Sequence, residues 1–318
     1  HHHSLPPRLA RVFKAYDIQG QCEIQADLVF AGKQKMPAEA TVTAVIHRLE
    51  MKKNTIQARA SGNVRAHITR PGTRDMRVEG AAEFNRTVIG RFEADHLTAG
   101  FTGNPDQFRV PEMKINAYGG TITCENMAFE PENRTWQARI MPAHMDVESL
   151  VGAFGVSGRQ APAGSLRGEI FLEGQGFDPE TLKGTGEIKI DRGRLYHFPV
   201  IASVFRVLDL QMPRQSPVTD AYGALKVHDG RLEIEDLLLL GGTMPMHVAG
   251  HVEFKKNRSL DRQHLELLIT TSRSESFLNN IPVISWVKHY TIDWFRRLAF
   301  QARVTGTIGE YEIHRLAS

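Results

Sequence analysis

The sequence predicts a mainly β protein: an elongated, curved antiparallel sheet, shaped as a groove or half-pipe, with a few covering α-helices. The first observation is period-two alternation, as where Val252 and Phe254 share one strand face and His251 and Glu253 the other. The second is that strand segments follow one another through short turns, without a helix between each pair. Recurrent strands of this kind argue against a parallel α/β sheet and favour an antiparallel sheet with one solvated face.

Strands are expected along most of the chain, separated by glycine, proline and asparagine turn signals. In the first part, the strand segments are residues 22–30, 40–51, 54–69, 76–84, 87–97, 108–118 and 121–129. Further on, the cleanest alternation covers residues 168–173, 187–191, 250–254 and 300–305. Such a pattern gives each strand one apolar and one polar side.

Four segments are candidates for helices. Residues 146–154 begin with Asp146, a residue type that caps helix N-termini. Residues 199–210 carry a broad apolar stripe, with Pro199 at a position that the first turn tolerates. The other two are residues 7–16 and the apolar stretch 282–295, which contains Trp286, Tyr290 and Trp294.

An internal repeat relates residues 186–195 to residues 223–232. Both copies read Gly-x-apolar-Lys-apolar-x-x-Gly-Arg-Leu. Each copy is expected to be a strand, a tight turn and a returning strand, with positive φ at Gly193 and Gly230. The chain would then use one hairpin unit at least twice.

Composition excludes several classes of protein. The 318 residues include 39 basic and 36 acidic ones, a net charge of +3, with no basic blocks that would suit nucleic acid. Two cysteines exclude a disulfide-dense scaffold and a four-cysteine zinc site. No apolar run reaches the roughly 18 residues of a membrane span. His1–His3 resemble the remnant of a purification tag, so the chain is expected to be excised from a longer protein.

No catalytic, metal or cofactor motif stands out, so we expect a protein that is not an enzyme and holds neither metal nor cofactor. Gly-x-Ser-x-Gly and His-Glu-x-x-His are both absent from the sequence. His247 and His251 lie about 13 Å apart at strand rise, too far for one metal ion. Two Gly-x-Gly segments, at residues 174–176 and 184–186, lack the third glycine and the following Lys-Ser or Lys-Thr of nucleotide-binding motifs.

An ordered series of segments is similar to the C-terminal region of the AsmA-like family, the group of AsmA, TamB, YhdP and YdbH. The strongest piece is Leu182-Lys183-Gly184-Thr185-Gly186-Glu187-Ile188-Lys189-Ile190, which leads to Gly193-Arg194-Leu195. The other segments are residues 117–122, 145–151, 164–168, 230–232, 236–239, 250–254 and 304–308. The resemblance covers about residues 115–310, which suggests a β-rich part over 4–115 and the AsmA-like region over 116–318, and the two are expected to form one continuous structure.

The resemblance implies a non-catalytic periplasmic protein of diderm bacteria that binds or transfers lipid and supports outer-membrane biogenesis. It implies a phospholipid or lipopolysaccharide-type ligand, an inner-membrane anchor that this chain lacks, and envelope protein partners; nucleic acid is not a partner. In such a compartment Cys22 and Cys124 could form a disulfide. No catalytic residues come with the resemblance.

The candidate lipid-binding positions are the apolar residues of the alternating strands. With few helices, the sheet either folds on itself or leaves part of its apolar face for hydrocarbon. The positions are Ile170, Leu172, Ile188, Ile190, Leu232, Ile234, Val248, Val252, Phe254, Leu265, Leu267, Ile269, Phe300, Ala302 and Val304. Each is also compatible with an ordinary closed core.

Two other functions remain open from the sequence. One is a structural scaffold or interaction module of envelope assembly, with a closed β core and no lipid channel. The other is a carbohydrate-active β-solenoid enzyme, which would need clustered carboxylates and exposed aromatic platforms. Only three tryptophans are present, and two of them lie in one expected helix, so the second alternative has little support.

Overall fold

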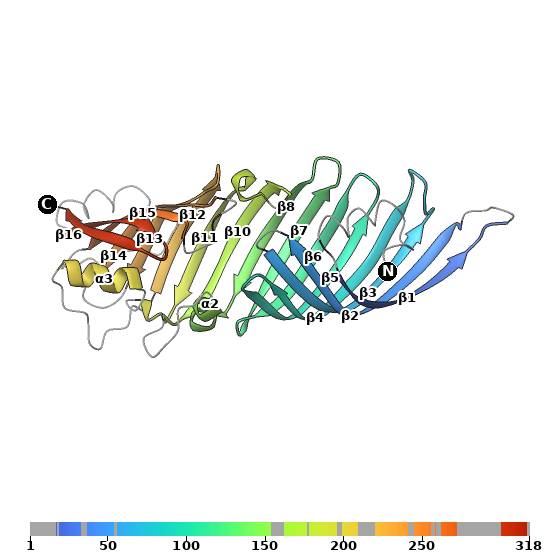
Figure 1. Cartoon of the computed structure of the whole chain (residues 1–318), viewed down its shortest axis with the longest axis horizontal. Coiled ribbons are helices and arrows are strands. Elements are labelled where there is room, and N and C mark those ends of the chain that lie inside the picture. Colours follow the sequence, from blue (N-terminus) through green and yellow to red (C-terminus); the bar gives the residue numbers. More distant parts are fainter. Residues whose placement is uncertain are drawn as a thin grey trace. The chain divides into compact units, whose positions relative to one another are not determined.

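A computed structural model describes most of the chain: residues 17, 19–32, 37–53, 56–153, 162–176, 178–195, 199–208, 220–240, 245–255, 258, 262–271 and 300–316. Among these residues the strands form one long antiparallel sheet of 17 strands that is not closed, accompanied by two short α-helices (Figure 1). The predicted fold class, a mainly β protein on an antiparallel sheet with few helices, is confirmed.

The chain divides into two compact units, residues 1–140 and 141–318. In the first unit, seven strands pair with their neighbours in sequence order. They are β1 (Gln19–Val29), β2 (Glu39–Lys53), β3 (Ile56–Thr69), β4 (Arg77–Ile89), β5 (Phe92–Gly103), β6 (Phe108–Ala117) and β7 (Gly120–Glu130). The next strand, β8 (Thr135–Ala143), includes the boundary between the units. The division that the sequence suggested after residue 115 falls within β6 and stays a prediction.

In the second unit the strands from β10 onward also pair in sequence order. They are β10 (Ser165–Gln175), β11 (Lys183–Asp191), β12 (Asp220–His228), β13 (Arg231–Leu240), β14 (Met246–Glu253), β15 (His264–Thr271), β16 (Phe300–Thr307) and β17 (Tyr311–Leu316). The two-residue strand β9 (Met145–Asp146) pairs with the start of β10. A short 3₁₀ helix, η2 (Pro179–Thr181), lies between β10 and β11.

Two tight turns explain why the sequence reverses where it does. Tyr118 and Gly119, with φ of 49° and 70°, join β6 to β7, and Asp229 and Gly230, with φ of 50° and 69°, join β12 to β13. Positive φ at both central residues is the type I′ geometry that matches the twist of a hairpin. The predicted turn at Gly230 is therefore confirmed.

The first copy of the repeat does not form the predicted hairpin. Positive φ falls on Arg192 (53°) instead of Gly193, and β11 is followed by a helix instead of a returning strand. The backbone N–H of Arg194 donates a hydrogen bond to the carbonyl of Ala163 at 2.9 Å, and Gly193 is buried. The chain that leaves the end of β11 is thus held by a segment distant in sequence, which a local repeat cannot reveal.

The two helices of the described residues lie where the sequence placed them. In α2 (Val147–Ala153), Asp146 Oδ1 accepts hydrogen bonds from the N–H groups of Glu148 (2.7 Å) and Ser149 (3.2 Å), which confirms the predicted N-cap. The helix α3 (Pro199–Val207) confirms the second prediction, although it ends three residues earlier than expected. The predicted helices at 7–16 and 282–295, with Trp286, Tyr290 and Trp294, lie outside the described residues.

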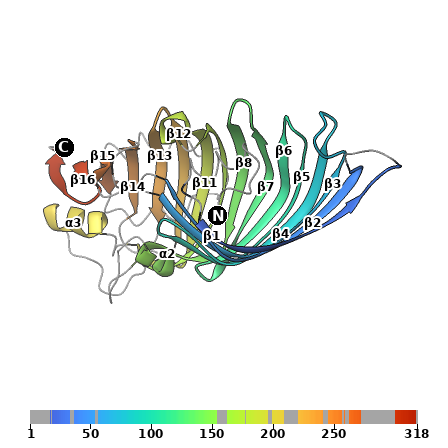
Figure 2. The same ribbon diagram turned by 45° about the vertical axis from the view of Figure 1, so that its right-hand side comes forward.

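The main hydrophobic core lies between α3 and the second unit's sheet. Ile201, Val204, Phe205 and Leu208 from the helix segment share one buried cluster with residues of β12 to β16. Both ribbon views place α3 beside β14 and β16 (Figures 1 and 2). A smaller cluster in the first unit is built on Ala94, Ile115, Ala117 and Cys124. None of the described helices has the length and apolar character needed to cross a membrane.

Candidate functional site

The strand register places the candidate positions on one face of the second unit's sheet. Directly opposed residues of an antiparallel pair point to the same side. One cross-strand row runs through Leu237, Val248, Ile269 and Ala302, and another begins with Leu232, Val252 and Leu265. Ile170, Leu172, Ile188 and Ile190 join the same face through β10, β11 and β12, and Phe254 follows directly after β14. We call this surface the apolar face of the second unit.

Part of this face is covered by α3, and we call that part the covered half. Val248, Leu265, Ile269, Ala302 and Val304 are buried in the cluster that contains the helix. Ile190, Val252, Leu267 and Phe300 are partly buried and pack against this cluster. These side chains have a packing role without any ligand, and their assignment to lipid binding stays a prediction.

The remaining candidates form the open half of the face. Ile170, Leu172, Ile188, Leu232, Ile234 and Phe254 are only partly buried, and in the described part of the chain they stand outside the cluster under α3. The register adds Leu225, opposite Ile234, and Val227, opposite Leu232. These two residues were not among the candidate lipid-binding positions, although their alternation with Lys226 was a usable signal.

Glycines lie across from the large side chains of the open half. Ile170 faces Gly186, Leu172 faces Gly184, and Ile188 faces Gly223. A Cβ on Gly186 would lie 2.9 Å from Ile170 Cγ1, and one on Gly184 would lie 2.8 Å from Leu172 Cδ2. The branched side chains therefore extend over the neighbouring strand where a side chain is missing, and they form a shallow apolar floor.

The first unit has an apolar face of its own, which the candidate list did not include. In β4, Val78, Gly80, Ala82 and Phe84 are partly buried, whereas the residues between them are exposed. In β1, Ile24 and Leu28 oppose Ala44 and Ala40 on the same side, and they remain 65% and 50% exposed. The same period-two alternation would have identified these positions.

In the second unit, the face opposite the apolar face carries charged pairs, several of which connect neighbouring strands. His247 Nε2 lies 2.8 Å from Asp236 Oδ1, and Arg303 Nη2 lies 2.6 Å from Glu266 Oε1. Lys189 Nζ lies 2.7 Å from Asp191 Oδ1, and this hydrogen bond is the main reason why the pKa of Asp191 is below its ordinary value. Charged side chains that pair with one another in this way are typical of a sheet face in contact with water.

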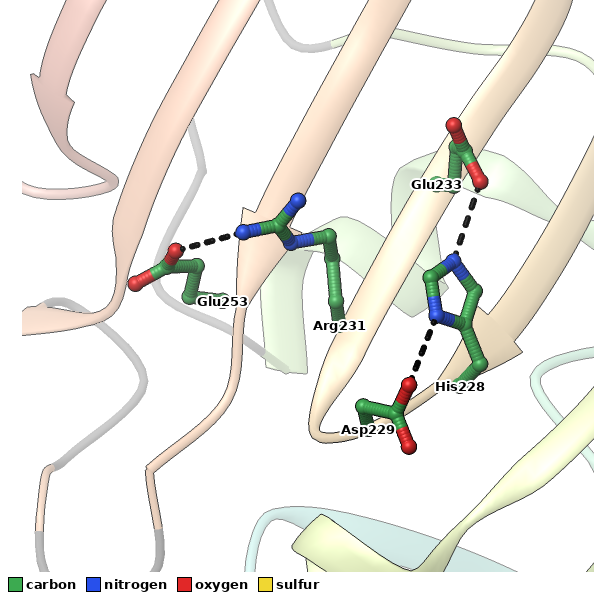
Figure 3. A network of polar contacts seen from close by, with 5 residues as sticks. All are labelled: His228, Asp229, Arg231, Glu233 and Glu253. Atoms are coloured by element: carbon green, nitrogen blue, oxygen red, sulfur yellow. Dashed lines mark hydrogen bonds and ion pairs between the residues drawn. The ribbon is translucent and has the colours of Figure 1, made fainter.

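A polar hollow of about 570 Å³ lies where β12 turns into β13. It is lined by Glu180, Asp229, Gly230, Arg231, Glu253, Phe254 and Lys255. Arg231 Nη2 lies 3.0 Å from Glu253 Oε1, and next to it His228 lies between Asp229 (3.4 Å) and Glu233 (3.1 Å), as Figure 3 shows. We call this feature the turn hollow. Its lining contains Phe254, which is also one of the apolar candidates.

The two cysteines are free thiols in different surroundings. Cys22 is exposed on β1, whereas Cys124 is buried in the small cluster of the first unit. Burial raises the pKa of the Cys124 thiol to about 11 because it disfavours the thiolate. The disulfide between them that the sequence left open is not formed.

Within the described ranges, no group of three or more His, Cys, Asp or Glu side chains is arranged to hold a metal ion. Comparison of the chain with models of protein families, with curated proteins and with solved structures found no match. The similarity to the AsmA-like family therefore stays a prediction, and the functional proposal depends on the geometry of the chain itself.

Proposed function

We propose that this protein is a non-catalytic lipid-binding or lipid-transfer module, with acyl chains lying along the open half of the apolar face. The observation that carries the proposal is a sheet that is not closed, with partly buried Ile170, Leu172, Ile188, Leu232 and Ile234 outside the helix-covered core. Apolar side chains in such a position favour contact with hydrocarbon over contact with water.

The energetics suit a long apolar ligand. Each methylene removed from water contributes about 0.8 kcal/mol, so an acyl chain that buries about six of them gains about 5 kcal/mol. The large side chains Ile170, Leu172 and Ile188 reach over neighbouring glycines and are apolar, so these side chains need no hydrogen-bond partner when water is removed. The affinity for the acyl chain would thus come from the apolar area that is buried and would depend little on hydrogen bonds.

The cellular setting belongs to the proposal and is supported by the family resemblance alone. A periplasmic module held by an inner-membrane anchor outside this chain would carry phospholipid or a lipopolysaccharide-type lipid toward the outer membrane, with envelope proteins as partners. A module of this kind needs no catalytic residues.

The test compares adjacent residues on opposite faces of β10. Ile170→Asp places a charge on the open half, whereas Phe171→Asp places it on the other face, where Phe171 is 43% exposed. We expect Ile170→Asp to lower binding of a fluorescent long-chain fatty acid at least fivefold without changing the circular dichroism spectrum. Phe171→Asp should bind like the unmodified protein. Equal binding by all three proteins, or no binding by any of them, would contradict the proposal.

A scaffold role is the second candidate, and the covered half favours it. Val304 and Ile269 are almost fully buried beneath α3 and need no ligand to be satisfied. If Ile170 belongs to a similar closed core, Ile170→Asp will unfold the second unit as Val304→Asp is expected to do. Cooperative loss of structure in both variants would favour the scaffold.

A further inference from the structure

The turn hollow combines charges of both signs around one space. Its carboxylates are Glu180, Asp229 and Glu253, and its cations are Arg231 and Lys255. Among the described residues, neither the Lys255 ammonium nor the Glu180 carboxylate has a hydrogen bond or an ion pair, although the Lys255 charge contributes to the lowered pKa of Glu253. The hollow therefore keeps one positive and one negative group available for a ligand.

The Arg231–Glu253 pair holds one wall of the hollow in place. One guanidinium N–H group is used by Glu253 at 3.0 Å, and a guanidinium has five N–H groups in a planar fork. The remaining donors suit a phosphate, which arginine binds through two parallel hydrogen bonds. Asp229, whose carboxylate is 86% exposed, and Glu180 supply the matching acceptors for a cation.

The hollow meets the open half at the turn end of the strands, where Phe254 follows β14. Arg231 and Glu253 oppose each other on β13 and β14 and point away from the apolar face, on which the adjacent pair Leu232 and Val252 lies. Phe254 lines the hollow, and its N–H donates a 2.6 Å hydrogen bond to the carbonyl of Gly230. A molecule with one polar end and one apolar end could have its polar end in the turn hollow and pass around the strand end at Phe254 to the apolar face.

We propose that the turn hollow binds the headgroup of a zwitterionic glycerophospholipid that carries a phosphate and a primary ammonium group. Arg231 and Lys255 take the phosphate, Glu180 and Asp229 take the ammonium, and the acyl chain begins at Phe254. This inference rests on the proposed lipid-binding function and adds a ligand class and a fixed orientation to it.

The test uses soluble dihexanoyl phospholipids and the full chain, with affinities from titration calorimetry. The phosphatidylethanolamine form should bind more tightly than the phosphatidylglycerol form, which lacks the ammonium, and the phosphatidylcholine form, whose ammonium cannot donate hydrogen bonds. Lys255→Gln should weaken binding of all three lipids. Glu180→Gln should weaken the phosphatidylethanolamine form most, by about fivefold, the factor of one exposed ionic contact near 1 kcal/mol, and should leave the phosphatidylglycerol form, which has no cation, without this loss.

Matched controls come from the first unit, where Lys114 and Glu112 form an exposed pair. Lys114→Gln and Glu112→Gln should leave all three affinities unchanged. Equal affinity for the three lipids, unaltered by Glu180→Gln and Lys255→Gln, would overturn the headgroup site and leave the proposed function intact. Absence of binding to any lipid would overturn both. Binding of glycerophosphoethanolamine as tight as that of the lipid would show that a free phosphoester is the ligand.

Discussion

Single residues differ most in which face of the sheet they occupy and in whether another element covers them. The two cysteines illustrate this difference, because one lies on an exposed strand and the other in a buried cluster. Their reactivity should follow, since the thiolate is the reactive form and burial disfavours it.

Cys22 should react quickly with a thiol reagent, and Cys124 should react only after unfolding. The raised pKa of Cys124, about 11, leaves little thiolate at neutral pH, and the surrounding side chains block access. Titration with a chromogenic disulfide should give one thiol per native chain and two in denaturant. In a Cys22→Ala variant the native value should fall to zero; a fast-reacting thiol in that variant would contradict the burial of Cys124.

The Arg231–Glu253 pair should make stability depend on acid pH. Hydrogen bonding to Arg231 holds the pKa of Glu253 below its ordinary value of 4.5. A depressed pKa in the folded state gives stability that is complete above the unfolded pKa and is lost as pH falls through the folded pKa. The unfolding free energy of Glu253→Gln should therefore lie below that of the unmodified protein at neutral pH and approach it in acid.

Urea unfolding at several pH values measures this convergence. Arg231→Gln should reproduce the altered pH profile, because it removes the cation that lowers the pKa. The double variant should add little to either single change. A difference between Glu253→Gln and the unmodified protein that stays constant from neutral to acid pH would exclude the pair as its source.

At the scale of elements, α3 decides which part of the apolar face is closed. Phe205 is buried in the core cluster, whereas Val207 at the end of the same helix is 39% exposed. Phe205→Ala should cost about 3–5 kcal/mol of unfolding free energy, the range for a buried phenylalanine that leaves a cavity. Val207→Ala should change it by less than about 1 kcal/mol. Chemical denaturation measures both, and similar small losses would mean that α3 packs loosely.

Strand glycines should respond differently according to their surroundings. Gly250 has φ of +145°, and a Cβ there would collide with the carbonyl oxygen of Glu266 on β15. Gly100 in β5 has no atom within 4 Å of an added Cβ. Gly250→Ala should lower the melting temperature clearly, whereas Gly100→Ala should leave it unchanged or raise it slightly. Equal effects would contradict the close approach at Gly250.

Strands and helix starts were predictable from the sequence because their causes are local. Alternation identified β14 and most of β4, and Asp146 identified the start of α2 through its own side-chain hydrogen bonds. The predicted strand at 87–97 was wrong, because the turn at residues 90–91 separates β4 from β5 there. The turn that the repeat predicted at Gly193 was wrong, because the backbone there is held by a hydrogen bond from Arg194 to Ala163. Contacts between segments that are distant in sequence leave no local signature.

At the scale of the whole molecule, burial differs greatly among the strands. Every described residue of β1 is exposed, whereas β14, β15 and β16 each contribute to the main core. Amide hydrogen exchange should therefore be fastest in Gln19–Val29 and slowest in β14 to β16. Mass spectrometry of peptic peptides resolves these segments, and strong protection of β1 would contradict its exposure.

The candidate site was predictable only in part. Period-two alternation assigned Ile170 and Val304 to one face, and the register agrees, because a strand's faces follow from its own sequence. The alternation did not show that the two residues differ in burial, although Val304 is buried beneath α3 and Ile170 is not. Coverage depends on where a helix packs. The turn hollow depends likewise on Glu180 meeting Gly230, which are 50 positions apart in the chain.

The pairing of glycines with large side chains affects how a bound acyl chain would move along the open half of the apolar face. Ile170 and Ile188 extend over Gly186 and Gly223, so their side chains fill the space that the glycines leave on the neighbouring strands. The apolar surface is therefore more even from strand to strand. If acyl chains bind here as proposed, a hydrocarbon tail that moves over this even surface would meet a nearly constant interaction energy, with low barriers from one strand to the next. Gly186→Val would raise a ridge across this track, which would slow translocation more than it would weaken equilibrium capture.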